Sequence, residues 1–251
     1  MQGALGKGEA VAETVNAIPT ESRFGRLGIL VGEGGLDRLA SARIIVLGLG
    51  GVGGSCALTL ARSGVGNLIL IDGDVVEPSN FNRQAIAFEP FLGMPKPLAC
   101  ARLIADINPA CNVEPICRQL TPDDVSSLLD EPFDYLLDCI DDLPVKIALA
   151  AECAERGLPI VSSMGTARKW RPDMLRFTDL SKTRGCPVAK IMRRELRRRG
   201  IEHLQVLYSE EIPAPMLSDS PRPLGSNAIV PPVAGTMLAG YAVRALLGLS
   251  A

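Results

Sequence analysis

Short apolar runs alternate with longer segments of helical periodicity along most of the chain. The runs are rich in Val, Ile and Leu and lie at residues 44–47, 67–71, 113–117, 135–140, 159–163, 175–180 and 205–208. Helical periodicity or helix-start signals mark residues 55–62, 96–107, 143–156, 187–199 and 233–247. Strands that alternate with helices favour parallel crossovers, which bury a sheet on both faces. We therefore predict an α/β fold with a mostly parallel central sheet, helices on both faces and a mixed C-terminal extension.

The first of these strands runs directly into a glycine-rich turn. Gly48, Gly50 and Gly53 form a G-x-G-x-x-G motif, with Gly51 inside it, between a predicted strand and a predicted helix. Without Cβ atoms a ligand can approach the backbone, and the following helix can point N–H groups at phosphates. Asp72 follows about twenty residues later, where nucleotide-binding folds hold a ribose. The pattern predicts a Rossmann-like nucleotide site, the alternative being a tight turn that binds nothing.

Composition and charge narrow the choice of partners. The 251 residues include 26 basic and 28 acidic side chains, a net charge of −2, so a polyanion must bind at a local patch. None of the seven cysteines forms a C-x-x-C pair, which argues against a four-thiolate zinc site. Their apolar surroundings and the lack of a signal peptide or membrane-span pattern predict a cytoplasmic protein with reduced thiols.

The chain is expected to form one folded domain behind a tail. Residues 1–20 are rich in Gly, Ala and Glu without periodicity, which predicts a disordered segment. Residues 21–251 are expected to form a single domain, with a nucleotide-binding half at about 40–165 and a substrate-facing half at about 166–251.

Polar side chains concentrate where ligands bind in such folds, beyond the carboxyl ends of the strands. The loop after Asp72 and the start of the next helix contribute Asp74, Asn80, Arg83, Gln84 and Lys96, and the strand at 135–140 leads into Asp141. A loop this long and polar is typical of a functional segment. Asp141 has a second interpretation, as the cap of the following helix.

In order and spacing, residues 48–54, 72–74, 79–84, 96 and 139–142 resemble the ubiquitin-activating-enzyme-like superfamily. The resemblance implies an ATP- and Mg²⁺-dependent enzyme that adenylates a carboxylate and releases pyrophosphate. It implies nucleotide contacts from Gly48, Gly50, Gly51, Gly53, Asp72, Asp74, Asn80, Arg83, Gln84, Lys96, Asp141 and Arg26. Arg83, Lys96 and Asp141 would be catalytic, and Asp141 would also hold the metal. Arg26 would reach across a homodimer into the partner's site.

The second half is similar to the tRNA threonylcarbamoyladenosine dehydratases, at residues 23–27, 178–183, 206–211 and 224–235. This implies ATP-dependent activation of the threonyl carboxylate of N6-threonylcarbamoyladenosine in tRNA, followed by cyclisation with loss of water. A sulfur-handling protein is a further implied partner.

Other classes stay open at this point. One is an adenylyltransferase for a ubiquitin-like sulfur-carrier protein, which would need a thiol, with Cys186 as the candidate. Such enzymes usually carry two C-x-x-C zinc pairs, which this chain lacks. A dinucleotide oxidoreductase is disfavoured because Arg83 and Lys96 suit a triphosphate, and a non-catalytic nucleotide sensor is disfavoured by the intact polar set.

A local basic patch supplies the candidate tRNA surface. Helical spacing places Lys190, Arg193, Arg194, Arg197 and Arg198 on one face, with Glu195 expected to point away. The loop at 165–172 adds Arg168, Lys169 and Arg171 around Trp170, whose ring is suited to stacking on an unpaired base. The alternative is an ordinary solvated helix face.

Overall fold

The computed structural model describes residues 21–217 and 224–249, and the tail predicted at residues 1–20 lies outside the described residues. One sheet has the order β3-β2-β1-β4-β5-β7-β6. Its strands are β1 (Arg43–Leu47), β2 (Asn67–Ile71), β3 (Asn112–Ile116), β4 (Tyr135–Asp138), β5 (Ile160–Ser163), β6 (Leu175–Asp179) and β7 (Gln205–Ser209). Every neighbouring pair is parallel except β6 and β7, which are antiparallel. The predicted α/β class and the mixed C-terminal end of the sheet are confirmed.

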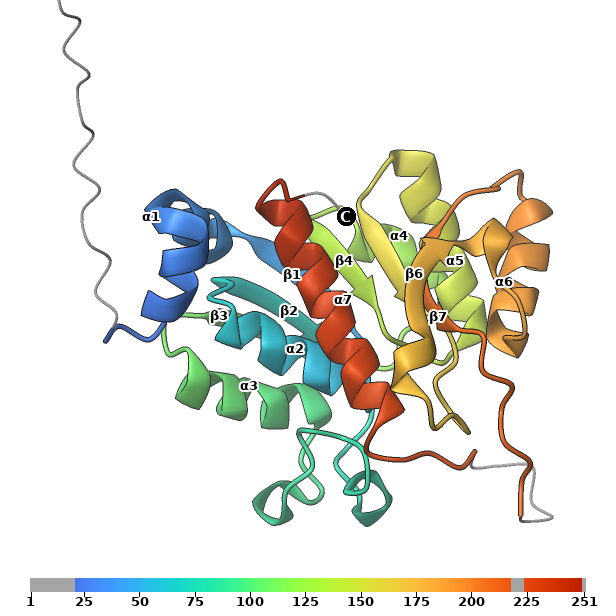
Figure 1. Ribbon diagram of the computed structural model, residues 1–251, viewed down its shortest axis with the longest axis horizontal. Coiled ribbons are helices and arrows are strands. Elements are labelled where there is room, and N and C mark those ends of the chain that lie inside the picture. The colour runs from blue at the N-terminus through green and yellow to red at the C-terminus, as the bar shows by residue number, and fades with distance from the viewer. Residues whose placement is uncertain (1–20, 218–223, 250–251) are drawn as a thin grey trace, which may run out of the picture.

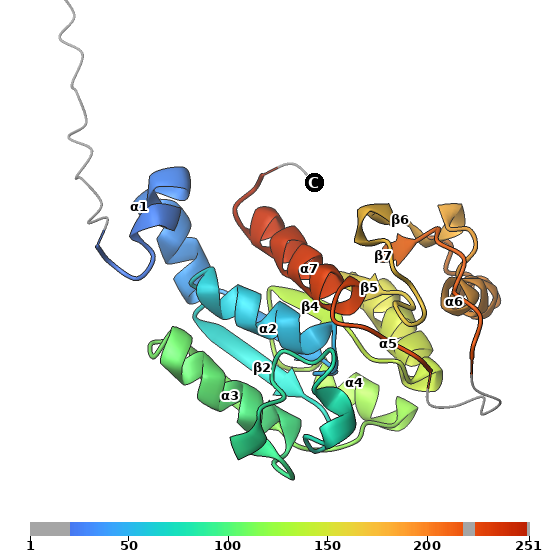
Figure 2. The ribbon, with the colours of Figure 1, turned by 60° about the horizontal axis from the view of Figure 1, so that its bottom comes forward.

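Helices cover both faces of the sheet (Figures 1 and 2). They are α1 (Gly25–Ser41), α2 (Gly53–Arg62), α3 (Lys96–Ile107), α4 (Val125–Leu128), α5 (Leu143–Arg156), α6 (Pro187–Arg197) and α7 (Val230–Leu246). α2 packs against α3 and α7 on one side, while α5 packs against α4 and α6 on the other. Within the described residues, none of these helices has the combined length and apolar character that spanning a membrane requires.

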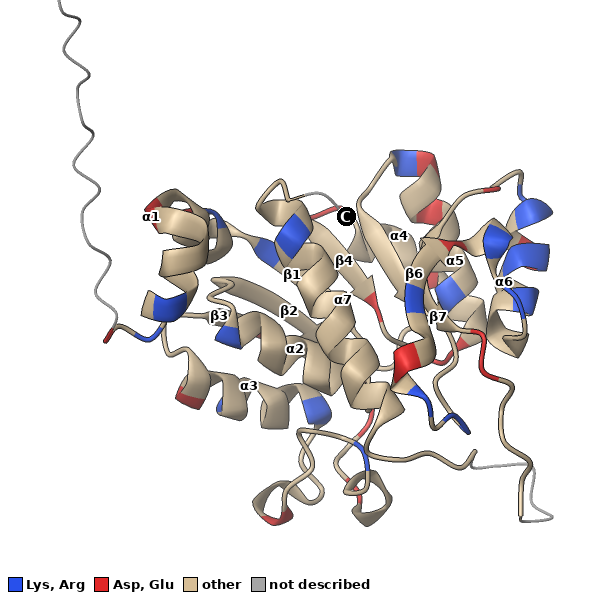
Figure 3. Cartoon of the chain, in the orientation of Figure 1, with Lys and Arg blue, Asp and Glu red and all other residues tan. Residues whose placement is uncertain are grey.

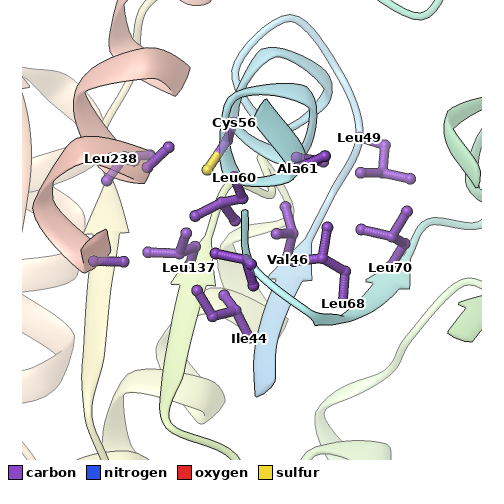
Figure 4. Packing of buried hydrophobic residues seen from close by; sticks show 14 of the residues in the cluster. Ile44, Val46, Leu49, Cys56, Leu60, Ala61, Leu68, Leu70, Leu137 and Leu238 are labelled. Atoms are coloured by element: carbon purple, nitrogen blue, oxygen red, sulfur yellow. The ribbon is translucent and has the colours of Figure 1, made fainter. Parts of the chain in front are cut away.

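Alternate residues of the central strands enter two different cores. Ile44 and Val46 of β1 pack with α2 and α7 in the larger core, part of which Figure 4 shows. Ile45 and Leu47, which point the other way, pack with α5 residues such as Val145. Because side chains alternate along a strand, a sheet buried on both faces needs apolar residues in succession. This is why the strands read as continuous apolar runs in the sequence.

The sheet reverses its strand order between β1 and β4. β1 pairs with β2 on one side and with β4 on the other, and the chain turns outward in opposite directions from this point. The crevice outside the carboxyl ends of two such strands is where open α/β sheets bind ligands. The glycine turn follows β1 and Asp141 follows β4, so the fold brings both to this crevice.

Helix α2 begins in direct contact with the backbone of the glycine turn. Gly48 has a φ of 83°, a conformation that L side chains rarely adopt. A Cβ added to Gly53 would lie 1.7 Å from the Gly48 carbonyl oxygen. α7 meets the same turn from outside, because a Cβ on Gly235 would lie 2.1 Å from the Val52 carbonyl oxygen. The turn is therefore held between two helices.

Candidate nucleotide site

Asp72 connects the end of β2 to the glycine turn. Its Oδ2 accepts the Leu49 N–H at 2.6 Å, and its Oδ1 accepts the Asp74 N–H at 2.8 Å. Burial raises the pKa of the Asp72 carboxyl, while the Lys96 ammonium and the two N–H donors act in the opposite direction. A carboxylate has about four lone-pair positions, so acceptor capacity is left for a ribose hydroxyl.

Lys96 is a nearly buried cation at the start of α3. The residue is 5% exposed, and its ammonium lies 2.7 Å from Asp74 Oδ2 and 3.9 Å from Asp72 Oδ1. Its backbone N–H also donates to the Asp74 carbonyl oxygen at 3.0 Å. Lys96 and both aspartates therefore form one cluster beside the glycine turn.

The loop after Asp74 brings Arg83 onto the glycine turn. A Cβ added to Gly51 would lie 3.2 Å from the Arg83 carbonyl oxygen and 3.4 Å from its Cγ. The Arg83 guanidinium donates to the Ser79 carbonyl oxygen at 2.8 Å and to Asn82 Oδ1 at 3.0 Å. These bonds fix the direction of the side chain, while a Cβ on Gly50 would meet nothing within 4 Å. The turn therefore has an open side beside a fixed cation.

Two buried amides complete this loop. Asn80 Oδ1 accepts the Glu77 N–H at 3.2 Å, and the Asn80 carbonyl oxygen accepts the N–H groups of Arg83 and Gln84. Gln84 is buried, and within the described residues its Oε1 has no hydrogen-bond partner. A buried amide oxygen without a donor is costly, so it marks a position suited to a polar ligand group.

Asp141 is exposed beyond the end of β4, which stops at Asp138, two residues before the predicted end. The helix-cap interpretation of Asp141 is wrong, because Asp142 caps α5 and its Oδ1 accepts the Val145 N–H at 3.0 Å. The preceding Ile140 packs on the glycine turn, where a Cβ on Gly48 would lie 2.9 Å from its Cγ2. The Asp141 carboxylate is thus placed at the crevice without an internal capping role.

Arg26 is separated from the other predicted nucleotide contacts within one chain. The residue is exposed on the first turn of α1. The adjoining Phe24 packs beside Gly64, which precedes the amino end of β2. The glycine turn lies at the carboxyl end of the strands, so a single protomer does not bring Arg26 to the crevice.

The loop after β5 holds its basic residues in internal contacts. Lys169 is 1% exposed, and its ammonium donates to the Ser209 carbonyl oxygen at 2.9 Å. Burial lowers the pKa of Lys169. Arg168 Nε donates to the Ala214 carbonyl oxygen at 2.6 Å, and Arg171 pairs with Asp173 at 2.5 Å. Lys169, which the sequence predicted as part of the tRNA surface, is therefore buried inside the protein and not on that surface.

Helix α6 carries a basic outer face, visible at the right of Figure 3. Lys190, Arg194, Arg197 and Arg198 are exposed there and surround a shallow hollow. The half-buried Arg193 donates to the Thr183 carbonyl oxygen at 3.0 Å. The expectation that Glu195 points away is wrong, because its carboxylate pairs with Arg194 at 2.9 Å and Arg198 at 3.0 Å. Arg198, three positions on, shares a helix face with Glu195, and the long Arg194 side chain reaches the same carboxylate from the adjacent position.

Sequence reasoning missed a buried ionic group next to Asp141. Asp138 Oδ1 lies 2.8 Å from the Lys146 ammonium, and both side chains are fully buried. A weak signal was present in each case: Asp138 ends an apolar strand, and Lys146 lies among the apolar residues of α5.

A mostly parallel sheet with a glycine turn and two cations at its switch point is typical of a Rossmann-like nucleotide-binding protein. The sequence model of the ThiF family matches residues 24–251. The chain belongs to the ThiF family.

Similar proteins in this family include tRNA-modifying enzymes. A tRNA threonylcarbamoyladenosine dehydratase of Bacillus subtilis is 38% identical over 240 residues, which cover 90% of this chain and 94% of the relative. The structure of the Escherichia coli tRNA N6-threonylcarbamoyladenosine dehydratase, TcdA, in complex with ATP has a TM-score of 0.83 and 32% identity, covering 90% of this chain and 94% of that chain. A molybdopterin-synthase adenylyltransferase of Haemophilus influenzae is 32% identical over 171 residues, which cover 64% of this chain and 70% of the relative.

The buried Lys169 predicts a specific pH dependence of stability. Because its pKa is lowered on folding, the unfolded chain binds more protons between that lowered pKa and about 10.4. The free energy of unfolding of the wild type should therefore rise with pH relative to Lys169→Met, by up to about 1.4 kcal/mol per pH unit in that window. Urea unfolding at a series of pH values measures the difference.

Lys190→Met, which alters an exposed lysine, is the control. A difference in free energy of unfolding between Lys169→Met and the wild type that stays constant with pH would contradict the lowered pKa of Lys169.

Proposed function

We propose that this protein uses ATP to activate the threonyl carboxylate of N6-threonylcarbamoyladenosine in tRNA. The activated carboxylate then cyclises within the same nucleoside with loss of water. The relatives named for this reaction span almost the whole chain, which supports the choice of substrate. A tRNA substrate fits a cytoplasmic protein, and any sulfur-handling partner would act after or beside this step.

The observation that carries the proposal is the convergence of two cations and one carboxylate on the glycine turn. Arg83 packs on Gly51, and Lys96 lies next to Asp72, which itself binds the turn. A triphosphate needs fixed positive charge where negative charge develops, whereas a nicotinamide does not. The site therefore supports attack of a carboxylate on the α-phosphorus of ATP, with release of pyrophosphate.

Asp141 is proposed as the magnesium ligand and as a catalytic residue at the reacting phosphate. Its carboxylate is exposed at the crevice, and no ion pair engages it within the described residues. Mg²⁺ is typically bound by one or two carboxylates together with substrate phosphates and water. When bound, the ion would neutralise charge on the phosphates, while Arg83 and Lys96 orient them.

A carrier-protein adenylyltransferase is the second candidate, favoured by the molybdopterin-synthase relative. It would use Cys186 if the reaction proceeded through an enzyme thiol. Cys186 is buried at the start of α6, so its sulfur is not presented to a protein substrate. An intramolecular cyclisation needs no such thiol.

The first test of the function is pyrophosphate release with each class of substrate. Bulk tRNA carrying N6-threonylcarbamoyladenosine should stimulate release by the wild-type protein, and carrier proteins should not. Asp141→Ala should lower kcat by about 100-fold or more, because it removes charge stabilisation in the transition state. Cys186→Ser should retain tRNA cyclisation. Stimulation by a carrier protein alone, or loss of activity in Cys186→Ser, would favour the second candidate.

We also propose a homodimer in which each site receives Arg26 from the partner. Arg26 cannot reach the crevice of its own chain, and the neighbouring Ile29 and Leu30 expose apolar side chains on α1. A closed two-fold dimer would cover this surface and bring the arginine to the other protomer.

Complementation between impaired variants tests this arrangement. Arg26→Ala and Asp141→Ala are each expected to keep only about 1% of wild-type turnover alone. When the two are co-expressed in equal amounts, mixed dimers contain one intact composite site, so turnover should recover to about a quarter of the wild-type value. If the site were complete within one protomer, the mixture would be no more active than either variant alone.

The tRNA is proposed to dock on the basic outer face of α6, together with Arg168, Arg171 and Trp170. Trp170 is 61% exposed beside this loop and is suited to stacking on an unpaired anticodon-loop base. Lys190 and Arg197 have no ion-pair partner among the described residues, so they are the cations most open to phosphates. The buried Lys169 would act from inside, by holding the loop to Ser209.

Charge reversal on α6 tests the docking surface. Lys190→Glu with Arg197→Glu should weaken tRNA binding and reduce the slope of log Kd against log salt concentration by about 2, because two phosphate contacts are lost. ATP binding should stay near the wild-type value. Arg62→Glu with Arg102→Glu, on α2 and α3, changes the net charge equally and serves as the control. Equal weakening by both pairs would indicate a general charge effect and contradict docking on α6.

A further inference from the structure

Three buried polar side chains form a closed network beneath the turn that carries Asp141. Asp138 ends β4, Lys146 lies on α5 and Ser162 lies on β5. The Lys146 ammonium lies 2.8 Å from Asp138 Oδ1, and the Ser162 hydroxyl donates to Asp138 Oδ2 at 2.5 Å. Lys146 also donates to the Ser162 hydroxyl oxygen at 3.2 Å. All three residues are 1% exposed or less.

Stability alone does not explain this network. Removing two charges from water is costly, and a buried ion pair can often be replaced by apolar residues of similar volume without loss of stability. Both charged side chains are fully buried, and their neighbours in sequence, Val145, Ile147 and Leu137, belong to the packed core. A role besides stability would therefore account better for a charged pair at this place.

The network joins the two ends of the turn at residues 139–142, which contains Asp141. Asp138 begins this turn and Lys146 lies one helical turn into α5. Asp138 Oδ1 also receives the Ile140 N–H at 3.4 Å, and the Asp142 carbonyl oxygen accepts the Lys146 N–H at 2.9 Å. The bond at Asp142 belongs to the helix backbone, while the side-chain pair ties the start of α5 to the end of β4, the two ends of the segment that contains Asp141.

The glycine turn restrains this segment from the other side. The Cys139 N–H donates to the Leu47 carbonyl oxygen at 2.8 Å, and Ile140 packs against Gly48. Between these restraints Asp141 is exposed beyond the carboxyl end of β4. Its position relative to a phosphate on the glycine turn is then set by the buried pair.

We propose that Asp138 and Lys146, oriented by Ser162, are positioning residues that hold the Asp141 carboxylate at the reacting phosphate. This inference rests on the role proposed for Asp141 above. The pair does not touch the nucleotide and acts only through the turn at residues 139–142.

The test replaces the pair without leaving a buried charge. Asp138→Asn with Lys146→Met removes both charges with little change in side-chain volume, so cooperative unfolding and the KM for ATP should stay close to wild type. The kcat for pyrophosphate release should fall by about 10- to 100-fold, because a small displacement of a reacting group has that effect. Ser162→Ala, which removes only the hydroxyl, should give a smaller fall in kcat with the fold retained. Arg156→Met, at the other end of α5, is the matched control and should keep the wild-type kcat.

Two further measurements separate positioning from general loss of structure. In an Asp141→Ala background the paired replacement should cause no additional fall in kcat, because its effect acts through Asp141. Amide hydrogen exchange at Ile140 and Asp141 should accelerate in the paired variant, and this readout does not depend on the substrate. A folded paired variant with wild-type kcat and unchanged exchange would overturn the inference. If the wild type itself releases no pyrophosphate with tRNA, the proposed function fails. The hydrogen-exchange measurement would still test whether the buried pair restrains the turn at residues 139–142.

Discussion

The fold and the site both depend on a backbone contact that only glycine permits. α2 begins with Gly53 directly over the Gly48 carbonyl oxygen, and a Cβ there would stand 1.7 Å from that oxygen. The first turn of α2 is therefore held against the end of β1, with its N–H groups directed toward the crevice. Ile140 and Arg83 pack on the same turn from two other segments. This contact therefore fixes the glycine turn on which Arg83 and the segment before Asp141 are placed.

Among the described residues at the carboxyl edge of the sheet, some carboxylates are paired with buried lysines and one is exposed without such a partner. Asp72 is bonded by two N–H groups beside Lys96, and Asp138 is paired with Lys146. In a medium of low dielectric constant such charges interact strongly, and an unpaired one would be very unfavourable. Asp141, in contrast, stays exposed. The paired side chains of Asp72 and Asp138 are each held in one arrangement. The exposed carboxylate of Asp141 has no such partner within the described residues and is the group that can change its contacts when a ligand binds.

Local patterns predicted most of the fold, and tertiary contacts account for what they missed. All seven predicted strands are present within two residues of their expected ends, because a sheet buried on both faces requires continuous apolar runs. The glycine turn could also be predicted, because its glycine spacing meets a need of the backbone: a positive φ at Gly48 and no room for a Cβ at Gly53. Lys169 was misplaced because a basic loop with a tryptophan resembles a surface, while its partner Ser209 lies forty residues away in sequence. The Asp138–Lys146 pair was missed for the same reason: neither residue reveals its partner without the third dimension.

Helix α5 links the two parts of the proposed reaction. Its first turn follows Asp141 and is tied to β4 through Lys146. Further along, Ile147 and Ala151 pack with α6 residues such as Met192 in a separate buried cluster. Protein interiors are close-packed and resist small displacements, so this cluster connects α6 with the helix that follows Asp141. In the proposed docking of tRNA on α6, this packing would hold the modified base at a set distance from the nucleotide.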